Sequence, residues 1–153
     1  MKKKYLIIFS TASIAIIIDQ LTKFLINMNL ELNQSIPVIN NVFHLTYILN
    51  SGAGFGILQQ QKLLLIFISI IVIGVILYYI RKIKNEKVLQ VLAGLVLGGT
   101  MGNLIDRISY GYVIDFLDFR IWPIFNFADS FLTISVIGLI IYFWKKDKRR
   151  NIT

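Results

Sequence analysis

Length and composition place this chain in a membrane rather than in water. Its 153 residues are 56% hydrophobic and 16% charged, with a mean hydropathy of +0.71, whereas about a quarter of the residues of a soluble domain are charged. The chain has no cysteine and one histidine, which excludes disulfides, thiol nucleophiles and metal sites built from Cys or several His side chains. We expect one small domain, residues 1–153, without a separate soluble module.

The net charge of +8 is concentrated at the ends of apolar runs. Twelve of the sixteen Lys and Arg residues lie in three clusters, within residues 2–4, 81–87 and 145–150. This arrangement is typical of cytoplasmic loops under the positive-inside rule. A polynucleotide-binding surface would instead group basic and stacking aromatic residues on one folded face, so we expect no nucleic-acid partner.

Four apolar runs are each near the roughly 20 residues that cross a hydrocarbon core. They cover residues 5–26, 63–80, 88–105 and 127–144. The basic clusters then place both termini and the 81–87 loop in the cytoplasm, and segments 27–62 and 106–126 outside. The start of the chain also resembles a cleavable signal peptide, but no small-x-small site follows directly, so we expect the first span to be retained.

The two outer segments are not lipid-like. Segment 27–62 contains β-branched and aromatic residues broken by Pro37 and by Asn40–Asn41, which predicts short strands around a turn. Segment 106–126 is also strand-like and rich in aromatic residues, which suit the membrane–water interface. Together these segments are expected to form a small extracytoplasmic cap on the bilayer.

The third span carries a stripe of small residues. Gly94, Gly98 and Gly102 recur every four residues and therefore lie on one helix face. Such a stripe predicts that a neighbouring helix approaches closely.

Polar side chains within the spans are costly and therefore indicate function. At 1.5 Å per helical residue, Asp19 lies about 22 Å from the nearest cytoplasmic basic cluster, and Asn103 and Asp129 each lie about 24 Å from theirs. A core about 30 Å thick puts all three at one level, about 6–8 Å below the outer surface. Three helices are thus expected to present polar groups to one layer.

Each of these charged positions also has a structural interpretation. Asp19 and Lys23 are four residues apart and form either a simple interfacial ion pair or part of a site. Asp106 and Arg107, at the outer end of the third span, are equally consistent with a structural pair and with substrate contact. Asp129 has no basic neighbour and begins an apolar helix, so capping alone is the weaker interpretation.

Two further carboxylates, Asp115 and Asp118, lie in the outer segment. The order of residues does not decide which of them points toward the membrane. Asp115 is as consistent with a solvated loop carboxylate as with a reactive group.

Elimination leaves carboxylates as the reactive groups. A Ser–His peptidase would depend on His44, and no nucleophile-elbow sequence surrounds any serine. Two Asp side chains about 3 Å apart share one proton, because both cannot ionise. The ionised member removes a proton from water while the protonated member donates to the scissile carbonyl, so peptide hydrolysis needs neither a metal nor a covalent intermediate.

Five segments of the chain carry a more specific signal when they are taken together. They are Asp19–Lys23 (DQLTK), Asn50–Gly56 (NSGAGFG), Gly98–Arg107 (GGTMGNLIDR), Val113–Phe116 (VIDF) and Phe125–Ser130 (FNFADS). In this order they resemble the motifs of lipoprotein signal peptidase, also called signal peptidase II, a family of aspartic membrane peptidases. The resemblance implies four transmembrane helices with an extracytoplasmic β-cradle.

The resemblance also implies an activity and a location. The enzyme would cleave diacylglyceryl-modified prolipoproteins just before the lipidated Cys that ends a lipobox signal peptide. It would be a multi-pass protein of the bacterial cytoplasmic membrane, in contact with membrane lipid, with its active site near the outer surface. We expect it to act as a monomer without a cofactor or a metal.

Roles carry over by motif. The resemblance assigns the catalytic dyad to Asp115 and Asp129. The residues implied to position the substrate or support the site are Asp19, Lys23, Asn50, Gly52, Asn103, Asp106, Arg107 and Asn126. Of these, Asp106 is a rival for the dyad, although its place beside Arg107 favours an ion pair.

The sequence departs from the family pattern at three points. Gly54 stands where the family usually has Ala or Ser, and Thr100 where a smaller residue is common. Both changes bear on packing. The stretch between Asp115 and Asp129 is somewhat short, which leaves the geometry of the outer loop open.

Two other classes of function remain alternatives. A small proton-coupled transporter would use Asp19 and Asp129 as relay groups, but it would be expected to place its carboxylates near the midplane of the membrane. A membrane scaffold without catalysis would tolerate alanine at the buried polar positions.

Overall fold

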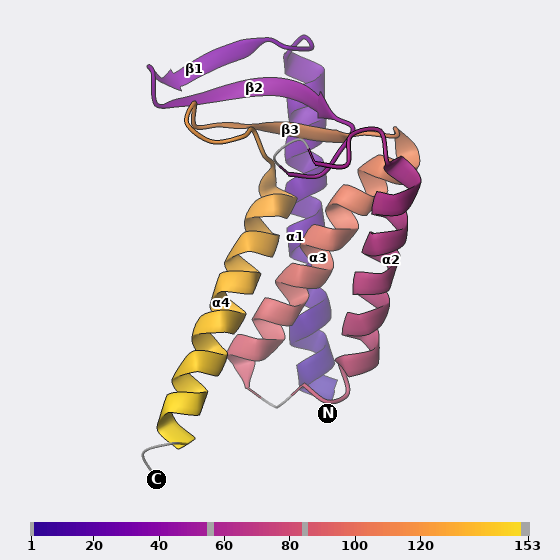
Figure 1. Ribbon diagram of the computed structural model, residues 1–153, viewed down its shortest axis with the longest axis vertical. Helices are drawn as coiled ribbons and strands as arrows, with labels where there is room; N and C mark the ends of the chain where they lie inside the picture. Colours follow the sequence, from indigo (N-terminus) through magenta and orange to yellow (C-terminus); the bar gives the residue numbers. More distant parts are fainter. Residues whose placement is uncertain (1, 55–56, 84–85, 151–153) are drawn as a thin grey trace.

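The computed structural model describes residues 2–54, 57–83 and 86–150. Within these residues, four long helices run side by side, and a three-stranded sheet lies across one end of them (Figure 1). The helices are α1 (Lys2–Asn29), α2 (Lys62–Tyr79), α3 (Lys87–Ser109) and α4 (Phe127–Arg150). Each of them is long and apolar enough to cross a membrane.

The helices confirm the four spans expected from the apolar runs. Helix α2 matches its run to within one residue at each end, whereas α1, α3 and α4 continue beyond theirs. A helix satisfies its own backbone hydrogen bonds wherever lipid excludes water, so the apolar run sets its minimum length. The sequence pattern contains no comparable signal for where a helix ends outside the hydrocarbon layer.

Helix α3 packs closely against its neighbours through its glycines. A Cβ atom on Gly98 would lie 2.6 Å from Ala15 Cβ and 2.8 Å from Ala12 O of α1. On the adjoining face, a Cβ on Gly99 would lie 2.6 Å from Ala128 O of α4. The predicted glycine stripe therefore does allow the close approach of α1, and Gly99, outside the stripe, allows that of α4.

The sheet forms the cap expected from the outer segments. Its strands β1 (Ser35–Ile39), β2 (Phe43–Asn50) and β3 (Val113–Asp118) pair antiparallel in the order β1-β2-β3. The outer strand β1 is exposed throughout, whereas almost every residue of β3 is buried.

A small apolar core attaches the sheet to the helix ends. It consists of the buried side chains Ile26 from α1, Tyr47 from β2, and Ile114 and Phe116 from β3. Strand β3 contributes two of these residues, and Asn126, just before α4, bonds Ile114 O and Asp115, so β3 is held against the helix ends. This position brings Asp115 to the helix bundle.

Candidate active site

Asp115 is a buried carboxylate held by two amides. Only 1% of its surface is exposed, and its two oxygens accept hydrogen bonds from Asn50 Nδ2 at 2.8 Å and from Asn126 Nδ2 at 2.6 Å. Burial, and then the charge of Asp129, raise the pKa of Asp115 to about 7, although the two amides oppose this shift. The structure therefore contradicts the interpretation of Asp115 as a solvated loop carboxylate.

Asp129 both caps α4 and faces the same region. Its backbone N–H donates to Asn126 Oδ1 at 2.9 Å, and its Oδ2 accepts from the backbone N–H of Asn126 at 3.3 Å. This reciprocal pair is a capping box at the start of the helix. The other oxygen, Oδ1, accepts a hydrogen bond from Asn103 Nδ2 at 2.8 Å. Capping is thus part of what Asp129 does, and it leaves the side chain beside a second polar group.

Asn126 connects the two carboxylates and is fully buried. Its Oδ1 accepts the hydrogen bond from the backbone N–H of Asp129 that caps α4. Its Nδ2 lies close to Asp115 Oδ1, to Asn103 Oδ1 at 3.1 Å and to Ile114 O at 3.3 Å. One amide therefore fixes the position of Asp115 relative to Asp129.

A buried lysine lies behind this pair. Lys23 Nζ is 2.8 Å from both Asp19 Oδ2 and Asp106 Oδ2, and it donates to Asn103 Oδ1 at 3.0 Å. Because an ammonium group only donates hydrogen bonds, the oxygen of Asn103 must face Lys23, which turns its NH₂ group toward Asp129. Asp19 and Lys23 are therefore more than an interfacial ion pair.

Asp106 forms an ion pair, but its partner is Lys23 rather than the adjacent Arg107. Arg107 instead donates from Nη2 to Gly52 O at 3.0 Å. Consecutive helical residues point in directions about 100° apart, so two such neighbours seldom pair with each other. This geometry makes Asp106 part of the support behind the cavity.

The backbone around Gly52 comes close to the following loop. A Cβ on Gly52 would lie 2.7 Å from Ile57 O, while Gly52 N donates to Asn50 Oδ1 at 2.9 Å. This bond fixes the Asn50 amide with its nitrogen toward Asp115. At Gly54, where the sequence departs from the family pattern, an added Cβ would meet nothing within 4 Å.

Gln20 belongs to the buried cluster and was missed by the sequence reasoning. Its Nε2 donates to Asp106 Oδ1 at 2.8 Å and lies 3.2 Å from both Asp19 Oδ2 and Gly102 O. The available signal was its position next to Asp19 in a polar stretch within an apolar helix. Nothing in that pattern shows which way the side chain points.

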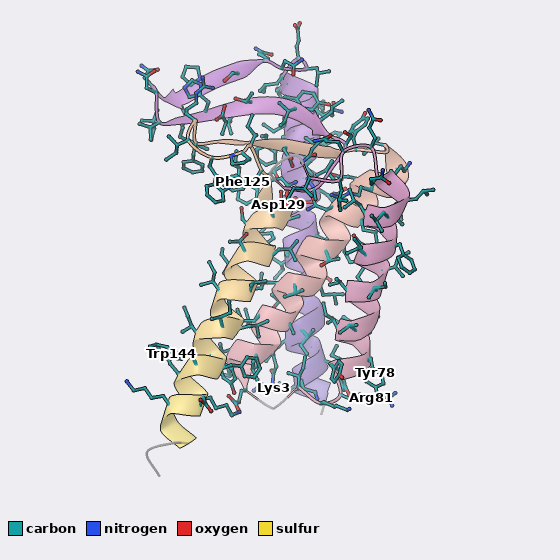
Figure 2. All side chains as sticks on the ribbon, viewed as in Figure 1. Lys3, Tyr78, Arg81, Phe125, Asp129 and Trp144 are labelled. Carbon is teal, nitrogen blue, oxygen red and sulfur yellow. The ribbon has the colours of Figure 1, made fainter. Side chains whose placement is uncertain are left out.

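Asp115 and Asp129 open into one cavity of about 620 Å³. Asn50 also lines it, and much of the remaining wall is apolar, including Trp122 and Phe125. Figure 2 shows Asp129 and Phe125 together at the sheet end of α4, far from Lys3 and Arg81 at the other end of the bundle.

Most of the remaining site residues expected from the sequence do not line this cavity. They are Asp19, Lys23, Gly52, Asn103, Asp106, Arg107 and Asn126. They hold the two carboxylates, or the backbone next to them, from behind.

Comparison with known proteins identifies the family. The family model described as Signal peptidase (SPase) II matches residues 11–145. The chain belongs to the signal peptidase II family. Members of this family are peptidases. The cavity that contains Asp115 and Asp129 is therefore the candidate active site of a peptidase.

Named relatives of this signal peptidase II chain cover almost its whole length. The lipoprotein signal peptidase of Halothermothrix orenii is 45% identical over 141 residues, which are 92% of this chain and 97% of the relative. The lipoprotein signal peptidase of Streptococcus agalactiae is 45% identical over 139 residues, which are 89% and 90% of the two chains.

Two solved structures, each described as a bacterial membrane enzyme, share the fold. One superposes with a TM-score of 0.86 at 35% identity and covers 97% of this chain and 92% of its own. The other has a TM-score of 0.79 at 36% identity and covers 94% and 93%. The four-helix membrane fold with a small sheet is therefore shared with known bacterial membrane enzymes.

Proposed function

We propose that this signal peptidase II is an aspartic endopeptidase that removes signal peptides from diacylglyceryl-modified prolipoproteins, just before the lipidated Cys. The observation that carries the proposal is that Asp115 and Asp129 open into one cavity and are connected by the amide of Asn126. The names of the relatives, lipoprotein signal peptidase, support the same substrate class.

The proposed chemistry needs one proton on the dyad. The ionised carboxylate takes a proton from a water molecule, whose oxygen attacks the scissile carbonyl carbon, while the protonated carboxyl donates to the carbonyl oxygen. When the tetrahedral intermediate collapses, one of its hydroxyls gives its proton to the ionised carboxylate, the C–N bond breaks, and the protonated carboxyl donates its proton to the leaving amine, so the dyad again holds one proton. The raised pKa of Asp115 supports this scheme, since it keeps a proton available near neutral pH.

The supporting residues fix the positions of the two dyad carboxylates before the substrate binds. Asn50, Asn103 and Asn126 each direct an amide NH₂ group at a dyad oxygen. Lys23 fixes the orientation of Asn103, and Arg107 fixes the backbone beside Asn50 through Gly52. Groups fixed in this way before the substrate binds need not reorient as charge develops.

We propose that both termini are cytoplasmic and that the cavity lies near the outer surface. Lys3 and Arg81 lie at the end of the bundle opposite Asp129 (Figure 2), and basic loops remain on the cytoplasmic side. The substrate then reaches the cavity from within the outer half of the bilayer, where its lipid and its apolar signal peptide already lie. We propose that one chain is sufficient for this reaction.

A proton-coupled transporter is less consistent with the position of these groups. Transporter sites lie near the bilayer midplane, between halves of the fold. Here Asp129 is in the first turn of α4 and Asp115 is in the sheet that covers the helix ends.

One assay tests the proposal against the transporter. The purified protein is incubated with a diacylglyceryl-modified lipobox peptide and, in parallel, with the unmodified peptide, and the products are analysed by mass spectrometry. We expect a new amino terminus at the lipidated Cys and much slower cleavage of the unmodified peptide. Proton flux in proteoliposomes without any cleavage would favour the transporter, and cleavage at another bond would contradict the proposed specificity.

A further inference from the structure

Beyond the first turn of α4, the residues of this helix that line the cavity are apolar except for Thr133. Leu132, Thr133 and Ile134 line this part of the cavity. Thr133 follows Asp129 by four residues, so it lies on the same face of α4, about 6 Å further along the helix axis. Its hydroxyl is therefore next to the reacting groups but deeper in the proposed membrane layer.

This hydroxyl differs from those of the two serines on α4. Ser130 Oγ donates to Asn126 O at 2.9 Å, and Ser135 Oγ donates to Phe131 O at 2.5 Å. In the described part of the chain, Thr133 Oγ1 has no hydrogen-bond partner. A helical Ser or Thr hydroxyl can bond the carbonyl three or four residues earlier, as both serines do, whereas Thr133 is exposed on the cavity wall. Within lipid an unbonded hydroxyl is unfavourable. Thr133 is thus a free donor on the cavity wall.

The substrate presents matching acceptors at this depth. A signal peptide keeps its basic start in the cytoplasm, so the residues before the scissile bond descend alongside α4. These residues must be extended near the dyad, and an extended backbone in lipid has unsatisfied carbonyl groups. The cavity-lining residues of β2, Ile48 to Asn50, pair with β3, and the pairing of β2 with β1 ends at Thr46. Strand β2 can therefore offer backbone groups only at the level of the sheet across the helix ends (Figure 1), and not at the depth of Thr133.

We propose that Thr133 is a positioning residue that donates a hydrogen bond to a backbone carbonyl of the signal peptide, about two residues before the scissile bond. The position follows from the depth, because an extended chain advances about 3.3 Å per residue and Thr133 lies about 6 Å below Asp129. This inference rests on the proposed function and on the proposed orientation in the membrane. The bond forms with the bound substrate and persists in the transition state, so it acts on binding.

Two substitutions separate the hydroxyl from the shape of the side chain. Thr133→Val removes the hydroxyl at nearly constant volume, and we expect KM for the lipidated lipobox peptide to rise about three- to tenfold while kcat stays nearly unchanged. Thr133→Ser keeps the hydroxyl, and we expect it to restore most of this loss. Ser135→Ala is the matched control on the same helix, since its hydroxyl is bonded within α4 and is outside the cavity lining. Its KM should stay at the native value.

Two modified substrates identify the acceptor. A peptide with a thioamide two residues before the scissile bond has a weaker acceptor there, and we expect it to raise KM for the native enzyme but not further for Thr133→Val. A substrate whose two acyl chains are ether-linked lacks the lipid ester carbonyls, and we expect both enzymes to respond to it equally. If the ether substrate alone removes the difference between the enzymes, Thr133 contacts the lipid and the proposal is wrong.

Failure of this inference is distinguishable from failure of the proposed function. If the native enzyme cleaves the lipidated peptide and Thr133→Val has the native KM, the positioning role is overturned and the dyad is unaffected. If the native enzyme does not cleave the peptide at all, both proposals are overturned.

Discussion

Asn126 serves both the helix cap and the dyad, and one substitution separates the two roles. Asn126→Ser keeps an oxygen that can cap α4 but removes the NH₂ group that bonds Asp115. We expect the cleavage rate to fall at least about tenfold, through loss of a charge-assisted bond. The free energy of unfolding should fall as well, because Asn126 is fully buried and its Nδ2 also bonds Asn103 and Ile114. Asn126→Ala loses the same amide bonds and also the cap, so we expect it to be less stable than Asn126→Ser by about 1 kcal/mol.

Thermal unfolding in detergent and the initial cleavage rate are the two measurements for this pair. If Asn126→Ser lowers stability as much as Asn126→Ala does, the oxygen is not acting as a cap. If the rate of Asn126→Ser is native, its amide does not position Asp115.

The raised pKa of Asp115 predicts how the activity depends on pH. Burial, followed by the charge of Asp129, raises its pKa from an ordinary 3.8 to about 7. Because the mechanism needs one proton on the dyad, we expect kcat/KM to fall as the pH rises through about 7. The folded state also binds this proton more tightly than the unfolded state, so its contribution to stability is full below 3.8 and is lost as the pH rises through about 7.

Asn50 provides a test of the cause of this pH dependence. Its hydrogen bond favours the ionised form of Asp115, so Asn50→Ala should move the fall in kcat/KM to higher pH. The measurement is the position of that fall in the pH profile, whatever the absolute rate. A shift to lower pH would contradict the assignment of the titrating group.

The close packing of α3 against α1 can be tested by alanine substitution of one glycine in a tight contact and one glycine in open space. Gly98→Ala would place its Cβ within 2.8 Å of Ala12 O, whereas a Cβ on Gly74 of α2 would meet nothing within 4 Å. We expect Gly98→Ala to lower the free energy of unfolding by about 1–3 kcal/mol. Gly74→Ala should be neutral or stabilising by up to about 1 kcal/mol, because alanine favours the helix.

Unfolding midpoints of the two variants, measured in the same detergent, decide the point. Equal midpoints for Gly98→Ala and Gly74→Ala would show that α3 does not need a glycine at its contact with α1. The comparison uses the same chemical change at both positions, so helix propensity alone cannot produce a difference of this sign.

The sequence was most informative about whole elements and less so about contacts between them. Lipid requires long apolar helices, so the spans could be predicted from the apolar runs, and Asn40–Asn41 indicated the turn between β1 and β2. The prediction that Pro37 breaks a strand was wrong, because Pro37 lies within β1, an edge strand that tolerates a missing N–H donor. Helix geometry makes the adjacent Arg107 a poor partner for Asp106, but the sequence does not show that Lys23 is the partner, because this depends on the rotation of α1 against α3. The inward orientation of Gln20 depends on the same rotation.

At the scale of the molecule, the absence of cysteine from the sequence allows a direct test of orientation. A single cysteine is introduced either at Asn40, in the exposed turn between β1 and β2, or at Lys148, near the exposed end of α4. We expect a membrane-impermeant maleimide to label Asn40→Cys in intact cells and Lys148→Cys only after permeabilisation. The opposite pattern would invert the proposed topology and place the cavity at the cytoplasmic surface.

The most direct test of the central proposal compares three Asp→Asn variants in one cleavage assay. Asp115→Asn and Asp129→Asn each remove a member of the dyad, whereas Asp118→Asn, on the same strand as Asp115, changes a carboxylate that bonds Thr46 and Arg120. We expect the first two to lose at least about a hundredfold in rate and the third to cleave at nearly the native rate. Near-native cleavage by either Asp115→Asn or Asp129→Asn would contradict the account.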